Sequence, residues 1–349
     1  LLWRQYSKGL GVTHGVVQMA QRGNDGVGPT RGMVNTFLMK NGLPIYNASS
    51  TYAGDEEISQ VRENRDGRLW LFLKEPGQTN ILYDSPENTH GTIKEPVPDI
   101  TNGSAGWSYS TGYALRKGLN YDGKHCGNFL GYTGSIIFRA AEAYLNYMEA
   151  CYEKTGTVDN VASGYWKQLR NRAFVDEDYN KTIAATNMSE EAKFDWGAYS
   201  AGQLIDPVLY NIRRERCSEL MAEGFRYMDL KRWRSMDQLV TTPYHIEGFR
   251  LWGPMQAWYD KPEGGTLLVY GLDDPTANVS APSISSYLRP YEINSKSLAL
   301  NGYKWSMAHY LAPIAIQHFM ITSPGDDISN SPIYQNPGWP LVPNQGPTM

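Results

Sequence analysis

NIRRERCSELMAEGFRYMDLKRW, at residues 211–233, predicts two helices that meet at a glycine. The first helix begins at Asp206 and Pro207, because an aspartate N-cap followed by proline in the first turn is a strong helix start. Gly224 ends this helix, since glycine is the residue most often found just beyond a helix C-terminus. We therefore predict a helical hairpin over residues 205–240.

Three glutamates spaced four residues apart place like charges on one face of the first helix. Such neighbours repel each other by roughly 0.2–0.5 kcal/mol per pair. Arginine guanidinium groups neutralise carboxylates well, because they form two parallel hydrogen bonds with them. We therefore expect a structural ion network made of Glu215, Arg216, Glu219, Glu223, Arg226 and Arg232.

A catalytic or metal-binding role for this glutamate row would need histidines three or four residues from the glutamates. Residues 211–233 contain none, and the six histidines of the chain show no ligand spacing. We expect no catalytic residue, no metal and no cofactor. Two acidic pairs, Asp273-Asp274 and Asp326-Asp327, are candidates for Ca²⁺, although neither lies in an alternating acidic loop.

A second helical hairpin is predicted at residues 132–173, where apolar side chains recur at three- and four-residue steps. Together the two hairpins resemble tetratricopeptide helical pairs, although residues 175–204 interrupt the period. A short helix is predicted at residues 30–40 with Thr30 as its N-cap, and the apolar run at residues 68–73 is read as a strand.

The segments at residues 42–131 and 241–349 are rich in Gly, Pro, Asn and aromatic residues and show little periodicity. Long irregular segments in compact proteins are usually functional. The predicted fold is mostly α, with tetratricopeptide-like helical hairpins, extensive irregular loops on the ligand side and a few short strands. We treat residues 1–349 as a single domain.

Charge and hydropathy argue against a nucleic-acid partner and against a membrane-spanning helix in this chain. The net charge is −4 and the basic runs are interleaved with acidic residues, whereas nucleic-acid binding needs unopposed cations. The longest apolar runs are far shorter than the 18 or more residues that span a bilayer. The 24 Tyr and 10 Trp suit contact surfaces, because these rings combine an apolar face with a polar tip.

Several segments resemble, in order, the signature segments of the SusD/RagB family. The strongest is the hairpin at residues 211–233 itself. The family patterns "SPT…DG-x-P", "RDPR-aromatic", "IRYAEVLLNYAEA", "VRNRAG" and "YLFPIP…QNPGY" resemble residues 28–44, 64–69, 137–150, 169–173 and 309–339, respectively. Three positions depart from the family: Gly67 replaces the usual proline, Ala312 the usual aromatic residue, and Phe174 stands where glycine is common.

The resemblance implies a lipid-anchored protein on the outer face of the outer membrane that binds oligosaccharides and passes them to a SusC-like TonB-dependent transporter. It implies no catalysis. The chain begins with Leu1 and not with methionine. We therefore expect the N-terminal part of the family, with its lipid-bearing cysteine and first helical repeats, to be missing.

Sugars present CH faces and hydroxyl edges, so their sites need aromatic plates with polar residues at the rim. Loop aromatics beside polar residues are the candidates, and family members carry binding aromatics near residues 65–69. We predict ligand contacts at Tyr52, Tyr83, Trp107 and Tyr109, with Trp70, beside Arg68, as a further candidate.

Two other functions stay open at this point. A peptide-capturing member of the same family would use backbone groups and pockets more than flat aromatic plates. A secreted glycoside hydrolase would need two carboxylates roughly 5–9.5 Å apart across a cleft.

Overall fold

The computed structural model describes residues 1–23, 27–81, 92–101, 108–342 and 344–348. The α-helices are α1 Val16–Arg22, α2 Arg31–Thr36, α3 Ile58–Arg62, α4 Gly67–Phe72, α5 Ala140–Thr155, α6 Asn160–Arg172, α7 Tyr179–Ala185, α8 Met188–Glu191, α9 Pro207–Glu219, α10 Arg226–Arg232 and α11 Ile316–Thr322. The strands are β1 Leu2–Arg4, β2 Thr79–Ile81, β3 Ile93–Lys94, β4 Ser135–Phe138, β5 Tyr199–Ser200 and β6 Gln203–Leu204. The described strands form three separate antiparallel pairs, β1 with β4, β2 with β3 and β5 with β6. The mostly helical fold with few short strands confirms the predicted fold class.

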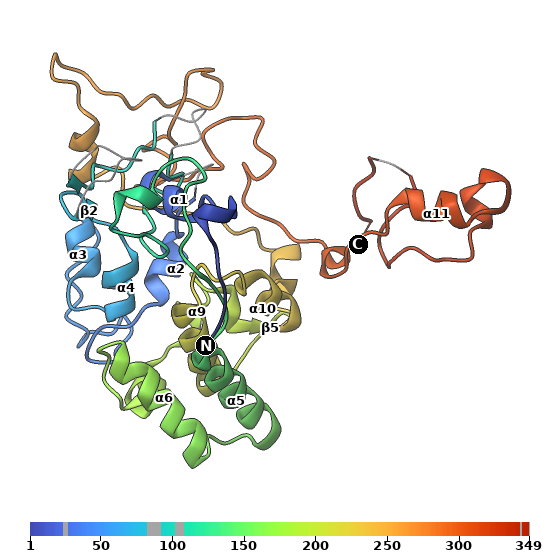
Figure 1. The fold of residues 1–349 in the computed structure, drawn as a ribbon, viewed down its shortest axis with the longest axis horizontal. Helices are drawn as coiled ribbons and strands as arrows, with labels where there is room; N and C mark the ends of the chain where they lie inside the picture. Colours follow the sequence, from blue (N-terminus) through green and yellow to red (C-terminus); the bar gives the residue numbers. More distant parts are fainter. Residues whose placement is uncertain (24–26, 82–91, 102–107, 343, 349) are drawn as a thin grey trace.

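Helix α9 lies at the centre of the helical part, and α5 packs against both α6 and α9 (Figure 1). Every residue of α9 from Leu209 to Glu219 is buried. The core around it contains Leu145, Trp166 and Ile212. Asp206 caps α9, because its carboxylate accepts hydrogen bonds from the amides of Val208 and Leu209 at 2.9 and 3.1 Å.

Both predicted hairpins occur with shorter helices than expected. Residues 132–139 include strand β4, so the first hairpin consists of α5 and α6 alone. In the second, α10 ends at Arg232, and Arg234 has a φ of +51°. Helix α9 already ends at Glu219, so the predicted end at Gly224 is too late. Gly224 lies in the turn between α9 and α10 and has a φ of +87°, a conformation that glycine adopts at little cost.

The strand expected at residues 68–73 is wrong, because the structure has helix α4 there. Asp66 is its N-cap and accepts a hydrogen bond from the Arg68 amide at 2.8 Å. Leu69 and Leu73, four residues apart, are buried, while Trp70 is exposed. Periodicity alone does not distinguish a short buried helix from a strand.

Helix α2 begins as predicted and ends early. The Thr30 hydroxyl oxygen accepts a hydrogen bond from the Met33 amide at 3.1 Å. Phe37 is already extended, and Met39 pairs with Arg65 in an isolated antiparallel bridge. The predicted helix therefore gives way after Thr36 to a turn that faces the entry to α4.

A second core lies beneath the loops and joins segments far apart in the sequence. Its buried residues include Phe37, Leu69, Tyr113 and Phe249. Gly112 shows how closely these loops pack, because its φ is +73° and a Cβ there would lie 2.2 Å from Phe249 Cδ1. The loop-rich half is therefore a packed body that can hold exposed side chains in fixed positions.

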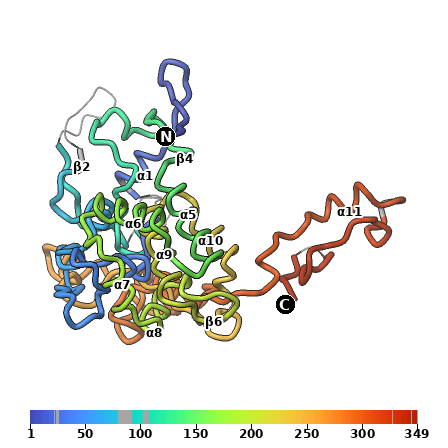
Figure 2. Tube along the Cα trace, turned by 90° about the horizontal axis from the view of Figure 1, so that it is seen from below, coloured from blue at the N-terminus to red at the C-terminus, as the bar shows by residue number. Residues whose placement is uncertain are grey.

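The C-terminal segment that carries α11 projects away from the rest of the molecule in both views (Figures 1 and 2). Within this segment, residues 336–339 fold back onto residues 308–312. The Asn336 side-chain amide donates to the Ala312 carbonyl at 2.7 Å, and Trp339 Nε1 donates to the Ala308 carbonyl at 2.9 Å. The two closing sequence segments noted above thus meet in space.

Candidate ligand site

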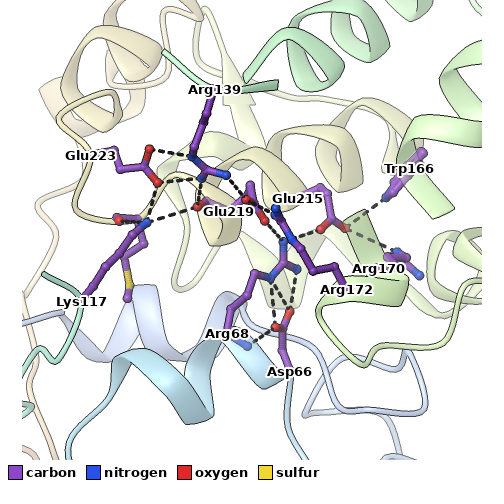
Figure 3. A network of polar contacts seen from close by, with 11 residues as sticks. Asp66, Arg68, Lys117, Arg139, Trp166, Arg170, Arg172, Glu215, Glu219 and Glu223 are labelled. Atoms are coloured by element: carbon purple, nitrogen blue, oxygen red, sulfur yellow. Dashed lines mark hydrogen bonds and ion pairs between the residues drawn. The ribbon is translucent and has the colours of Figure 1, made fainter. Parts of the chain in front are cut away.

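Glu215 and Glu219 of α9, and Glu223 just beyond it, are bound by cations from four other segments (Figure 3). Arg68 Nη1 of α4 lies 2.7 Å from Glu215 Oε1 and 3.1 Å from Glu219 Oε2. Arg139, which precedes α5, pairs with both Glu219 and Glu223, and its Nε donates to Glu223 Oε2 at 2.9 Å. The network therefore ties α4 and the start of α5 to the central helix.

Further contacts complete the network from α6 and a loop. Trp166 Nε1 donates to Glu215 Oε2 at 3.1 Å. Arg172 pairs with Glu219, and Lys117 Nζ lies 2.6 Å from Glu223 Oε1. All three carboxylates thus face positive or hydrogen-bonding partners.

The arginines that we expected to neutralise this row pair elsewhere, so that part of the prediction is wrong. Arg216 Nε lies 2.7 Å from Asp229 Oδ2, and Arg232 binds Asp229 and Glu149. Arg226 pairs with Asp195. Arg216 directly follows Glu215 and therefore points to a different face of α9, while Arg226 and Arg232 lie on α10.

The electrostatics of Glu219 follow from this arrangement. Burial alone would raise the pKa of its carboxyl, but Arg68, Arg139 and Arg172 together lower that pKa to about 2. The pKa of Glu223 is also lowered, because Arg139 and Lys117 outweigh its burial. These carboxylates stay ionised at neutral pH and hold the scaffold together.

Tyr52 lies on a loop with an unusual backbone. The preceding residue, Thr51, has a φ of +60°, which is rare for a β-branched side chain and marks local strain. The Tyr52 ring is half-buried, and the guanidinium of the buried Arg65 lies 5.3 Å from its centroid. Arg65 in turn donates to the carbonyls of Val34 and Phe37 at 2.8 and 2.7 Å, so the cation beneath the ring is fixed.

Polar and aromatic groups gather beside Tyr52. The Tyr287 hydroxyl donates to Asp55 Oδ2 at 2.7 Å, and the Arg31 guanidinium stacks 3.5 Å from the Tyr287 ring centroid. Arg250 lies 3.7 Å from Asp55 Oδ1. Burial raises the pKa of Tyr52, Arg65 and Arg31 oppose that rise, and Asp55 adds to it. We call Tyr52, Asp55, Tyr287, Arg31 and Arg250 the Tyr52 surface.

A pocket of about 220 Å³ adjoins this surface at Arg31. Its lining includes Arg289 and Glu247, and Glu247 is bound by Arg31 at 2.7 Å and by Arg289 at 3.0 Å. The volume lies below the roughly 300–1,000 Å³ of sites for drug-sized ligands. The pocket therefore has room for only one small polar group.

The other predicted contact residues lie elsewhere. Tyr109 is only 4% exposed, and its hydroxyl accepts a hydrogen bond from Lys74 Nζ at 3.1 Å. Lys74 Nζ also binds Glu95 at 3.0 Å and the Gln21 carbonyl at 2.7 Å. A ring held inside this buried cluster offers no face for stacking. Tyr83 and Trp107 lie outside the residues that the structure describes.

Sequence reasoning missed Tyr287, Asp55 and Arg31. Tyr287 and Asp55 are 232 residues apart, and no local pattern links them. Arg31 did follow a quoted segment, since it comes directly after Thr30, but its neighbours gave no sign that it stacks on a tyrosine.

Within the described ranges, no three His, Cys, Asp or Glu side chains are grouped as a metal site would require. The Asp274 and Asp327 carboxylates accept hydrogen bonds from Thr276 and Ser329, in turns of their own. No described helix is long and apolar enough to span a membrane.

The protein is a helical scaffold that presents irregular loops. The ion network lies at the centre of its helical hairpins, and the loops carry the aromatic surface. The sequence pattern of the SusD family matches residues 4–339. The chain belongs to the SusD family, which confirms the resemblance drawn from its sequence segments.

The fold is similar to the crystal structure of a SusD-like protein from Bacteroides fragilis, with a TM-score of 0.53 and 20% sequence identity. The similarity covers 97% of this chain and 53% of that protein, so the chain spans about half the length of the solved structure. No curated protein matches the chain.

Proposed function

We propose that the chain belongs to a cell-surface protein that captures oligosaccharides and delivers them to a SusC-like TonB-dependent transporter. Family membership supports this class of function. In this proposal the whole protein is anchored to the outer membrane by an N-terminal lipid and does not itself carry out catalysis.

The observation that carries the proposal is the Tyr52 surface. Two half-buried tyrosines, Tyr52 and Tyr287, lie beside Asp55, Arg31 and Arg250. Aromatic rings match the CH faces of sugars, while carboxylate and guanidinium groups match their hydroxyls. The strained Thr51 beside Tyr52 agrees with a functional loop, because strained residues cluster at ligand sites.

A glycan and peptide array on the chain, followed by isothermal titration with the best ligand, tests the proposal. We expect glycan binding, and we expect Tyr52→Ala to weaken it about 10-fold, since the loss of one aromatic contact costs about 1 kcal/mol or slightly more. Tyr109→Phe is the matched control, because this buried tyrosine has no exposed ring.

The outcomes separate the alternatives. Binding to peptides but not to glycans would favour the peptide-capturing function. Release of reducing ends from a bound glycan by the pure protein would favour a glycoside hydrolase. Equal affinity of Tyr52→Ala and the wild type would remove Tyr52 from the site.

A further inference from the structure

A second surface groove, of about 830 Å³, lies where the start of α4 meets the end of α6. Three large apolar side chains on it are exposed to solvent, with Trp70 at 55%, Leu71 at 50% and Phe174 at 75%. Polar residues complete the lining: Lys40, Ser59, Arg62, Glu63, Asn64, Arg65 and Glu75. A concave surface with aromatic plates and a polar rim is the form of a ligand site.

Phe174 adopts a conformation that its residue type disfavours. Its φ is +56°, in the left-handed region where a bulky side chain is an outlier. Its amide donates to the Asn171 carbonyl at 3.0 Å, and the next amide, of Val175, donates to the Arg170 carbonyl at 3.0 Å, so the turn at the end of α6 fixes this backbone. The ring is mostly exposed and adds little to the core. Stability alone would favour glycine here.

Two departures from the family pattern meet at this point. Gly67 stands in place of proline, and Phe174 stands in place of glycine. A Cβ at position 67 would lie 3.1 Å from Phe174 Cδ2 and 2.9 Å from the Ala173 carbonyl oxygen. The Gly67 amide also donates to that carbonyl at 2.8 Å, which proline could not do. The glycine therefore makes room for the phenylalanine, and the two departures form one feature.

The buried Arg62 side chain holds Trp70 in place. The Arg62 guanidinium lies 5.2 Å from the Trp70 ring, and Arg62 Nη2 donates to the Trp70 carbonyl at 2.6 Å. Arg62 is also paired with Glu75. Because its charge is neutralised by this carboxylate, Arg62 acts as a support for the aromatic plate rather than as an anion site.

The exposed rim carries donors and acceptors without an excess of charge. Lys40 and Glu63 contribute one charge of each sign, and Asn64 and Ser59 add an amide and a hydroxyl, all on exposed residues. Phosphate or sulfate recognition would need unopposed cations. Hydroxyl groups, in contrast, both donate and accept hydrogen bonds and therefore match a mixed rim.

We propose that this groove is a second carbohydrate site, which stacks uncharged sugar rings on Trp70 and Phe174. The inference rests on the proposed function for its ligand class, but it uses separate residues. Arg65 links the two surfaces, because its side chain lines the groove and its guanidinium lies 5.3 Å from the Tyr52 ring centroid.

The test is affinity electrophoresis of the 349-residue chain through gels that contain soluble starch, inulin, xyloglucan or galactomannan. We expect Trp70→Ala and Phe174→Gly each to weaken retention by the bound polysaccharide about 10-fold. Tyr227→Ala is the matched control, since Tyr227 is 53% exposed on α10 and does not line the groove. The melting temperature of Phe174→Gly should equal or exceed that of the wild type, so its loss of binding cannot come from unfolding.

The possible results separate the two proposals. Wild-type retention of both Trp70→Ala and Phe174→Gly, with weakened retention of Tyr52→Ala, overturns the groove and leaves the proposed function in place. Weakened groove variants with an unaffected Tyr52→Ala support the groove and reject the Tyr52 surface. A wild-type chain that none of the four polysaccharides retards overturns both.

Discussion

Replacing Glu219 with glutamine tests how much the ion network contributes to the fold. The substitution keeps the shape of the side chain and removes its charge. Glu219 is 3% exposed and faces Arg68, Arg139 and Arg172. Its loss would leave these guanidinium groups with one carboxylate fewer in a buried setting, where an unpaired charge is costly.

The pKa of Glu219 gives the size of the effect. It falls from the ordinary value of 4.5 to about 2. One pKa unit corresponds to about 1.36 kcal/mol, so the folded state favours the ionised carboxylate by ~3 kcal/mol. Breaking buried ion pairs costs a similar ~3–5 kcal/mol. We expect Glu219→Gln to lower the free energy of unfolding by ~3 kcal/mol at pH 7.

The same shift fixes the direction of the pH dependence. A carboxyl whose pKa is lower in the folded state stabilises the protein above its unfolded pKa, and this contribution disappears as pH falls from about 4.5 to about 2. The difference in unfolding free energy between the wild type and Glu219→Gln should therefore shrink to ~1.4 kcal/mol at pH 3.

Urea titration at pH 7 and pH 3 measures this difference, and urea is preferable to guanidinium because it does not screen charges. Glu190→Gln is the control, since Glu190 pairs with Lys193 on the surface at 2.7 Å and should change stability by only ~0.5 kcal/mol. A loss below ~1 kcal/mol for Glu219→Gln at pH 7, or an equal loss at both pH values, would refute the reasoning.

Three further substitutions test other parts of the structure. Tyr109→Phe removes one acceptor of the buried Lys74 ammonium and should cost ~1 kcal/mol by urea titration without changing glycan affinity; a change in affinity would return Tyr109 to the ligand site. Gly112→Ala forces a Cβ into Phe249 at a positive φ, so we expect a loss of ~3 kcal/mol or more and little soluble protein on expression, and a normal melting temperature would contradict this. Asp206→Ala removes the N-cap of α9 and should lower the free energy of unfolding by ~1 kcal/mol, measured against Asp206→Asn, which keeps an acceptor and should lose less.

The sequence predicted the features that local chemistry decides. The start of α9 follows from Asp206 and Pro207, and the turn between α9 and α10 follows from Gly224, although α9 itself ends earlier, at Glu219. The apolar spacing located α5 and α6. Where two structures satisfy the same local pattern, the prediction failed. The run at residues 68–73 is a helix because Asp66 caps it and because Leu69 and Leu73 reach the core on the same side.

The site depended on distant partners and was therefore less predictable. Arg68 and Glu219 are 151 residues apart, and Arg139 and Glu219 are 80 apart, so the spacing within α9 could not identify these cations. The solvent exposure of the candidate aromatic rings could not be predicted from the sequence either. Tyr52 and Tyr109 both follow polar loop residues, yet only tertiary packing makes the first half-buried and encloses the second.

The position of α9 also has a consequence for how quickly the chain folds and unfolds. Its charged side chains gain their partners only after α4, the start of α5 and α6 have arrived, and closing such long loops slows folding. The central helix should therefore reach its final packing late, after the folding barrier has been crossed. Interactions that form late affect mainly the unfolding rate. The network around Glu219 should therefore slow unfolding more than it speeds folding, and so prolong the lifetime of the folded protein.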